Sequence, residues 1–279
     1  MCKYNDKLDT AFKKEDLEIV LATMNRNSLD FLIPMFPFSD FSNFSILIVN
    51  QTQEANLLIS EFPSVRVINS FEKGLSKSRN LGLKNAQGKI LLIADDDVVF
   101  KNDFDSIIID TYNKFPSATG ISFYAEKPDG TLFKRSLSKT KEKIGQLELF
   151  NILSIEMTFN REMLTKLKLQ FDENFGLGSR FKMGEEAIFL SDVKSKNQQL
   201  IIEPQVVVVH PPVSTDDTIS FEERYYIQGA FFKRVENMNY YFGLFLKVFF
   251  DLKQNKIKMS QVFGAIKNAN RGKNDFLNY

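Results

Sequence analysis

Three consecutive aspartates, Asp95, Asp96 and Asp97, directly follow the apolar run Ile90–Ala94. A short apolar run closed by polar residues predicts a buried strand, so the three carboxylates are expected together at its end. Neighbouring carboxylates repel one another unless a cation shares them, and Mg²⁺ or Mn²⁺ usually binds one or two carboxylates together with substrate phosphates. The triplet therefore predicts a divalent-metal site, with solvated turn residues that cap the next helix as the alternative.

Other side chains suited to ionic chemistry lie far from the triplet in the sequence. His210, the only histidine, follows four valines, and imidazole can ligate Mn²⁺; a satisfied structural histidine is the alternative. Glu185 and Glu186 begin a predicted helix, where only one of two adjacent side chains can face a site. Both can instead complement the helix dipole. Arg79 lies early in the predicted helix Leu75–Asn85, whose N-terminus favours phosphate or carboxylate, with a surface arginine as the alternative.

A parallel sheet would bring these groups to one edge. The first hundred residues alternate short apolar runs, expected to be strands, with segments of helical pattern. The expected strands are Leu17–Ala22, Phe44–Val49, Val65–Asn69 and Ile90–Ala94, and the expected helices are Leu29–Met35, Gln53–Phe62 and Leu75–Asn85. This order predicts a mainly parallel sheet whose ligand crevice lies beyond the carboxyl ends of its strands. The segments at those ends are polar: Thr23–Asn27, Asn50–Thr52, Asn69–Gly74 and Asp95–Asp97.

The remainder of the chain continues this pattern and then becomes helical. The expected elements are a helix near Asp103–Phe115, a strand near Thr119–Tyr124, a turn at Pro128–Gly130, a strand at Ser154–Phe159, a helix at Arg161–Leu167, a glycine-hinged loop at Phe175–Ser179, a helix from Gly184 to about Lys196, a strand at Val206–Val209, and helices at Phe221–Asn237, Tyr240–Lys253 and Ser260–Ala269.

The block Gly74–Gly82, followed by Gly88 and the sequence ILLIADDD, resembles the donor-site block of family 2-like glycosyltransferases, and the resemblance extends over about Leu17–Pro212. It implies an α/β, Rossmann-like GT-A fold of the nucleotide-diphospho-sugar transferase type, with a mainly parallel central sheet. The GT-A catalytic domain would cover residues 1–216, with a nucleotide-binding half at about 17–100 and an acceptor half at about 101–216. A helical C-terminal extension would cover residues 217–279.

The resemblance also implies an activity. The chain is expected to be a metal-dependent glycosyltransferase that moves a sugar from a nucleotide-diphosphate donor, a UDP-sugar, to a hydroxyl of a carbohydrate or lipid-linked carbohydrate acceptor. This reaction serves polysaccharide or glycoconjugate synthesis. Two alternatives are a sugar-phosphate nucleotidyltransferase, whose usual N-terminal glycine-rich loop is missing, and a noncatalytic carbohydrate- or nucleotide-binding relative.

Residue roles follow from the resemblance. It assigns donor binding to Thr23, Asn25, Arg26, Asn50, Arg79, Asn80, Asp95 and Asp96, metal binding to Asp97, and an acceptor loop to Gly178, Ser179 and Glu185. His210 is proposed as a further ligand of the Mn²⁺ or Mg²⁺. Glu186 stands at the position of the catalytic base, which implies a single displacement with inversion. Asn50 replaces a common Asp, which leaves the nucleobase open, and a strand-end turn role is its alternative.

Composition excludes several other classes of protein. The 36 basic and 35 acidic residues give a net charge of +1, so no global field favours nucleic acid. Cys2 is the only cysteine, which rules out an intrachain disulfide, and the polar N-terminus does not resemble a signal peptide. The chain contains no Trp and no segment expected to span a membrane, whereas processive synthases of the family usually carry a Gln-Arg-Trp motif and spanning helices. A cytoplasmic, non-processive enzyme is therefore expected.

The C-terminal region is both basic and aromatic. From Lys233 to Tyr279 there are nine basic residues and three acidic ones, and aromatic side chains gather in Tyr240–Phe250. This pattern is compatible with peripheral contact with the inner face of a membrane or with a cover over the acceptor site. Packing in the core or in a homodimer is the alternative.

Overall fold

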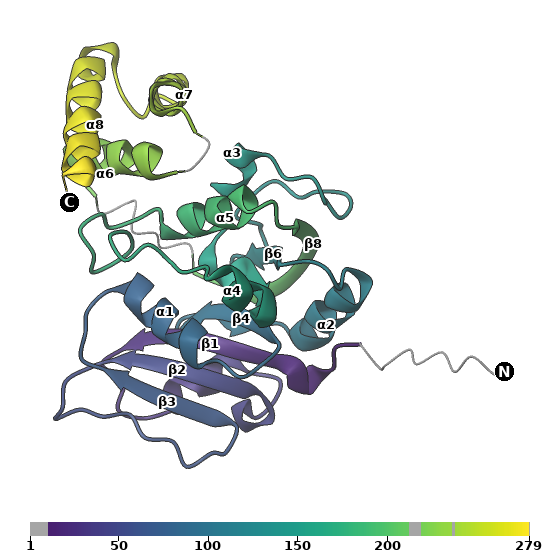
Figure 1. Cartoon of the computed structure of the whole chain (residues 1–279). Helices are drawn as coiled ribbons and strands as arrows, with labels where there is room; N and C mark the ends of the chain where they lie inside the picture. Colours follow the sequence, from purple (N-terminus) through teal and green to yellow (C-terminus); the bar gives the residue numbers. More distant parts are fainter. Residues whose placement is uncertain (1–10, 212–218, 236–237, 279) are drawn as a thin grey trace.

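An eight-stranded mixed sheet forms the centre of the molecule, with strand order β3-β2-β1-β4-β7-β6-β8-β5 (Figure 1). The computed structural model describes residues 11–211, 219–235 and 238–278. Cys2 and the predicted boundary between residues 216 and 217 lie outside these ranges. The strands are β1 (Leu17–Met24), β2 (Ser45–Gln51), β3 (Val65–Ser70), β4 (Ile90–Asp95), β5 (Val99–Phe100), β6 (Gly120–Glu126), β7 (Met157–Asn160) and β8 (Leu200–Val209).

The first half of the sheet is parallel, as predicted. β1 pairs in parallel with β2 and with β4, and β2 pairs in parallel with β3. The register sets Ala22 opposite Asp95 and Thr23 opposite Asn50, so these strands end at one edge. The side chains of β1, β2 and β4 are mostly buried because the sheet is covered on both faces here, which explains their continuous apolar runs, whereas the edge strand β3 is only partly buried.

The second half of the sheet reverses direction. β4 pairs antiparallel with β7, β7 with β6, and β8 with β5, while β6 and β8 are parallel. Four of the seven strand pairings among the described residues are therefore parallel. The antiparallel pairing of β5 with β8 sets Val99 opposite Val209, which brings the residue after β8, His210, close to the aspartates before β5.

The helices are α1 (Leu75–Asn85), α2 (Phe104–Lys114), α3 (Gln146–Leu149), α4 (Arg161–Leu167), α5 (Glu185–Ser195), α6 (Phe221–Arg234), α7 (Tyr240–Lys253) and α8 (Val262–Leu277). The predicted bounds of α1, α4 and α7 are confirmed. α8 is longer than predicted, and Asp30–Met35 is a 3₁₀ helix around Pro34. Among the described residues, none of the helices is both long enough and apolar enough to cross a membrane.

The helix predicted at Gln53–Phe62 is absent, and this connection between β2 and β3 is irregular. The side-chain amide of Asn69 accepts a hydrogen bond from the Leu58 backbone N–H at 3.0 Å and donates one to the Leu58 carbonyl at 2.9 Å. Leu58 is buried in the core. A tertiary contact of the Leu58 backbone therefore replaces the local hydrogen bonds of a helix.

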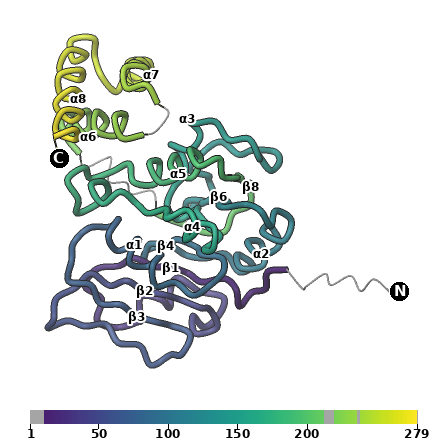
Figure 2. The backbone as a smooth tube through the Cα atoms, viewed as in Figure 1, coloured from purple at the N-terminus to yellow at the C-terminus, as the bar shows by residue number. Residues whose placement is uncertain are grey.

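Helices α6, α7 and α8 form a separate group beyond α5, at the top of the view in Figure 1 and in the backbone trace of Figure 2. Their apolar side chains share a core with Phe175 and Phe181, from the loop before α5, and with Ile188 of α5. The C-terminal extension is thus packed against the segment that begins with Glu185 and Glu186.

The crossing of α6 and α8 depends on two glycines. A Cβ atom at Gly229 would lie 1.8 Å from the carbonyl oxygen of Ala269, and one at Gly272 would lie 1.8 Å from that of Tyr226. Both distances are far shorter than a van der Waals contact. The clashing atoms belong to the backbone, which cannot move aside as the end of a flexible side chain can. The two helices therefore approach closely only because these positions lack a side chain.

Substitution of Gly272 by alanine is expected to lower the free energy of unfolding by about 2–3 kcal/mol, because the methyl group forces α8 away from α6. The same change at Gly264 of α8 is the control, since its Cβ would meet only the Phe221 ring, at 3.7 Å. Gly264→Ala should raise stability by about 0.5–1 kcal/mol through helix propensity. Urea denaturation measures both, and equal effects would contradict the close packing of α6 and α8.

Candidate active site

A cavity of about 1230 Å³ opens at the carboxyl ends of β1 and β4. Its walls come from four parts of the chain: the ends of the parallel strands, the segment 147–155, the loop before α5, and helices α6 and α7. The predicted site residues that line it are Thr23, Asp95, Asp96, Asp97, Gly178, Glu186 and His210. Residues separated by up to 187 positions in the sequence thus face one volume.

Each aspartate of the triplet has a different partner within the protein. Asp95 accepts hydrogen bonds from Arg79 Nη2 at 3.3 Å and from Ser154 Oγ at 3.2 Å. Asp96 forms an ion pair with Arg26 Nη2 at 2.7 Å and accepts a hydrogen bond from Thr23 Oγ1. The third residue, Asp97, lies 3.2 Å from His210 Nε2. Arginines therefore offset the charge of Asp95 and Asp96, and Asp97 is the carboxylate that the sequence assigned to the metal.

Asp97 and His210 remain as the pair suited to a metal. Their hydrogen bond lowers the pKa of the Asp97 carboxyl and raises the pKa of the His210 imidazole. Within the described residues, no group of three or more His, Cys, Asp or Glu side chains is arranged to hold a metal. A carboxylate oxygen and an imidazole nitrogen are both ligands of Mn²⁺, and both line the cavity, so the pair suits an ion completed by phosphate oxygens.

A buried arginine lies behind the aspartates. Arg79 is 2% exposed, and its Nη1 lies 3.2 Å from Glu185 Oε1 and 3.1 Å from Glu186 Oε1. Burial opposes its charge, but the carboxylates of Asp95, Glu186 and Glu185 outweigh burial and raise the pKa of the guanidinium. Asp95 is the third carboxylate beside Arg79, at 3.3 Å from its Nη2. Arg79 thus joins the end of β4 to the start of α5.

The two glutamates at the start of α5 point to different places. Glu186 lines the cavity, whereas Glu185 is buried and lies against Arg79. Burial and the charge of Glu186 raise the pKa of Glu185 from its ordinary value of 4.5 to about 8. The charge of Arg79 lowers this pKa but is outweighed, and Glu185 lies in the interior rather than on an acceptor loop.

Two asparagines assigned to the donor are occupied by the protein itself. Asn50 is buried, accepts a hydrogen bond from the Arg26 N–H at 3.1 Å, and donates to the Arg26 carbonyl at 2.9 Å. The other residue, Asn80, binds the Phe171 backbone through both of its amide atoms and does not line the cavity. Both side chains hold neighbouring loops in place. Asn50 binds the backbone of Arg26 and so fixes the point from which the Arg26 side chain extends.

Other predicted residues lie close to the site without facing the cavity. Asn25 is exposed and adopts a φ of 56°, which turns the chain after β1 toward Arg26. Ser179 donates its backbone N–H to the Gly176 carbonyl at 3.0 Å, in the glycine loop beside Gly178. The positive φ angles of Gly176 and Gly178, 103° and 78°, confirm the predicted glycine loop.

Several residues that line or support the cavity were not predicted from the sequence. Ser154, which donates to Asp95, stands in a 3₁₀ turn before β7, where a strand was predicted. Phe231 and Lys247 bring α6 and α7 to the cavity wall. The basic and aromatic pattern of the C-terminus indicated a cover over the acceptor side as one alternative, but it did not identify these residues.

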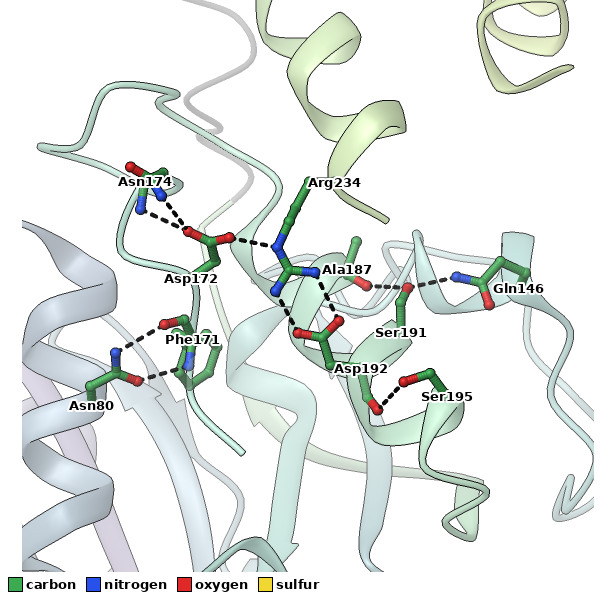
Figure 3. A network of polar contacts seen from close by, with 10 residues as sticks. All are labelled: Asn80, Gln146, Phe171, Asp172, Asn174, Ala187, Ser191, Asp192, Ser195 and Arg234. Carbon is green, nitrogen blue, oxygen red and sulfur yellow. Dashed lines mark hydrogen bonds and ion pairs between the residues drawn. The ribbon is translucent and has the colours of Figure 1, made fainter. Parts of the chain in front are cut away.

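An ionic contact fixes the extension to the helix that carries Glu186. Arg234, at the end of α6, donates to both carboxylate oxygens of Asp192 on α5, at 3.0 and 2.7 Å, and to Asp172 at 2.6 Å. Figure 3 shows the guanidinium between the two carboxylates. Nearby, the Phe231 ring packs on Gly184, where a Cβ atom would lie 2.9 Å from it. The start of α5 is therefore held by α6 as well as by Arg79.

Comparison with known proteins agrees with this geometry. Residues 38–167 match the model of glycosyl transferase family 2, which confirms the predicted resemblance. The structure of residues 1–349 of S. aureus TarS aligns with 92% of this chain and 80% of its own length, at 15% identity and a TM-score of 0.62. The same protein in complex with UDP-GlcNAc aligns at 14% identity, over 90% of this chain and 79% of its own length, with a TM-score of 0.60. No curated protein sequence matches the chain. The fold is the GT-A fold.

Replacement of Glu185 by glutamine is expected to flatten the dependence of the melting temperature on pH. The raised pKa means that the folded chain holds a proton that the unfolded chain releases. The stability from this proton is complete below the unfolded pKa and is lost as the pH rises through the folded pKa. Between about pH 5 and about pH 9 the native melting temperature should therefore fall several degrees further than that of Glu185→Gln.

The matched control is Glu162→Gln, since Glu162 is exposed on α4. This variant should follow the native curve of melting temperature against pH. Parallel curves for the native chain and Glu185→Gln would show that the Glu185 carboxyl is already ionised in the folded protein at neutral pH.

Proposed function

We propose that this chain, which has the GT-A fold and a family 2 segment, transfers a sugar from a nucleotide-diphosphate donor to a hydroxyl of a carbohydrate acceptor. The observation that carries the proposal is the meeting of Asp97, His210 and Glu186 on one cavity of about 1230 Å³. A volume of this size admits a nucleotide sugar with part of an acceptor. The reaction would serve polysaccharide or glycoconjugate synthesis.

The nucleotide would lie over the carboxyl ends of β1 and β2. Thr23 lines the cavity there, and Arg26 is held beside it by Asp96 and by the side chain of Asn50. A UDP-sugar is the donor class we favour, because a protein with this fold, S. aureus TarS, has been solved in complex with UDP-GlcNAc. The sugar and the base that this chain prefers depend on side chains that differ between the two proteins at 14% identity.

The diphosphate would be held at Asp97 and His210. When bound between these two side chains and the phosphates, Mn²⁺ or Mg²⁺ would offset the negative charge of the departing nucleoside diphosphate. Binding requires the imidazole in its neutral form, so the proton shared with Asp97 must leave. Asp96 also lines the cavity, but its Oδ2 oxygen is bound by Thr23 and Arg26, so we assign the ion to Asp97.

Glu186 is the group we assign as the catalytic base. In the proposed step an acceptor oxygen bonds to the anomeric carbon, the bond from that carbon to the diphosphate oxygen breaks, and the hydroxyl proton passes to the Glu186 carboxylate. Attack from the side opposite the leaving group inverts the configuration. Arg79 Nη1 fixes Glu186 Oε1 at 3.1 Å, so the carboxylate faces the cavity in one orientation.

The acceptor would enter between the glycine loop and the C-terminal helices. Gly178 lines the cavity on one side, and Phe231, Lys247 and Phe250 line it on the other. Aromatic faces pack well against sugar rings, while the charged rim keeps the hydroxyl groups oriented. With one sugar transferred for each binding event, the enzyme would be non-processive.

Replacement of Glu186 by glutamine should reduce sugar transfer about a hundredfold or more, while donor affinity remains near that of the native chain. Gln keeps the size of the side chain but cannot accept the hydroxyl proton. Transfer is measured by release of the nucleoside diphosphate with an acceptor present, and Glu162→Gln on α4 is the matched control. Unchanged transfer would remove the assignment of Glu186 as the base, and donor binding with no transfer in the native chain would indicate a noncatalytic relative.

Nucleotide sugars are expected to raise the melting temperature by several degrees only when Mn²⁺ or Mg²⁺ is present, because a ligand that binds the native state stabilises it by mass action. Asp97→Asn should abolish this dependence on metal. Asp103→Asn is the control, since Asp103 precedes α2 and its side chain makes no capping hydrogen bond. A full shift in the presence of a chelator would show that the donor binds without a divalent ion, and it would contradict the metal site at Asp97 and His210.

A further inference from the structure

One side of α7 presents aromatic rings to the surface. Tyr241 is 70% exposed, Phe245 is 62% exposed and Phe249 is 49% exposed, and Phe242 lies beside them at 57%. These four side chains, here called the aromatic face, recur at the spacing of one helical side. Rings of this size are seldom left in water together unless the surface has a partner.

The opposite side of α7 is fixed, so the aromatic face cannot turn inward. Leu244 and Val248 are buried in the core that α7 shares with α6 and α8. The buried Asp251 accepts a hydrogen bond from Tyr225 of α6 at 2.8 Å and pairs with Lys247 at 2.9 Å. Rotation of the helix to hide its rings would expose Leu244 and Val248 to water and break the hydrogen bond between Tyr225 and Asp251.

Exposed apolar side chains concentrate in this part of the molecule. Of the seventeen large apolar side chains that are exposed in the described ranges, nine lie between Tyr241 and Leu277. They include Met259 and Phe263, at 74% and 80% exposure, which begin and follow the turn into α8. Exposed apolar side chains are therefore present at the start of α8 as well as on α7.

Exposed basic side chains lie at the end of α7, in the connection that follows it and on α8. Lys253, Lys256, Lys258 and Lys267 are exposed, and none of them forms an ion pair with a residue that the structure describes. The segment from Lys233 to the C-terminus carries nine basic residues against three acidic ones. An apolar face edged by unpaired lysines is complementary to a layer of anionic headgroups over acyl chains.

From these observations we infer that the aromatic face docks the protein on an anionic lipid bilayer. Phenylalanine rings would enter the boundary between headgroups and acyl chains, and the lysines would extend to the phosphates. A second copy of the chain is a poorer partner, because a two-fold interface sets the same lysines opposite one another. Phe250 and Lys256 are exposed beside this face and also line the cavity, so the cavity opens next to the docked surface.

If the cavity opens beside a membrane, the acceptor belongs to the lipid-linked class. This conclusion about the acceptor rests on the proposed function. An acceptor carried on a membrane lipid would reach the cavity along α7, whereas the nucleotide sugar would enter from solution. Membrane docking itself requires no activity and can be tested alone.

The experiment is co-sedimentation with phosphatidylcholine vesicles with and without phosphatidylglycerol. The native chain should bind the anionic vesicles, and added salt should weaken binding because surface charges are screened. A Phe245→Ser, Phe249→Ser double variant should bind at least about tenfold more weakly, since two apolar rings are lost from the contact. Lys253→Gln with Lys258→Gln should also weaken binding, but only to the anionic vesicles.

Ile59→Ser is the matched control, because Ile59 is exposed in the β2–β3 connection and lies outside the cavity. The melting temperature of the phenylalanine variant and its shift with donor and Mn²⁺ should equal those of the native chain, which separates a failure of docking from a failure of the proposed activity. Native protein that stays in the supernatant would overturn the inference. Self-association in sedimentation velocity that disappears in the phenylalanine variant would assign the face to a second copy instead.

Discussion

The arrangement of the site depends on one buried guanidinium. Arg79 contacts Asp95 at the end of β4 and both glutamates at the start of α5, and its side chain is almost wholly removed from water. A buried arginine without anionic partners is strongly unfavourable, and so is a cluster of acidic side chains without a cation beside it. Each partner therefore requires the others, and this requirement sets the distance between the strand that carries Asp97 and the helix that carries Glu186.

The parallel half of the fold was accessible from sequence because its strands are buried on both faces. Runs such as Ile90–Ala94 are apolar at every position, and the polar segments that follow them all lie at one edge. The two-residue strand β5 was not accessible, since Val99 and Phe100 are too few for any periodic pattern. The segment Gln53–Phe62 has a helical pattern, but the side chain of Asn69 competes successfully for the Leu58 backbone. Such a tertiary hydrogen bond leaves no trace in the local sequence.

The site was predictable to the extent that its residues are unusual for their position. A triplet of aspartates after a buried strand, and a single histidine after four valines, both indicated the edge where Asp97 and His210 now lie 3.2 Å apart. Asn50 and Asn80 illustrate the opposite case. An asparagine amide serves a ligand and a backbone loop equally well, and only the fold shows that these two bind Arg26 and Phe171. The contacts of Asp96 with Thr23 and Arg26 likewise depend on the pairing of β1 with β4, which the local sequence does not show.

The C-terminal helices have two functions that constrain each other. α6 holds the start of α5 through Arg234 and through the packing of Phe231 on Gly184, while α7 completes the cavity wall. Figure 1 shows α7 beside the pair of α6 and α8, which cross closely at Gly229 and Gly272. A helix in that position must satisfy a core on one side and the surroundings on the other. Asp251 and Leu244 hold one side of α7 against the other helices. The rings on the other side of α7 therefore remain at the molecular surface and do not contribute to the core.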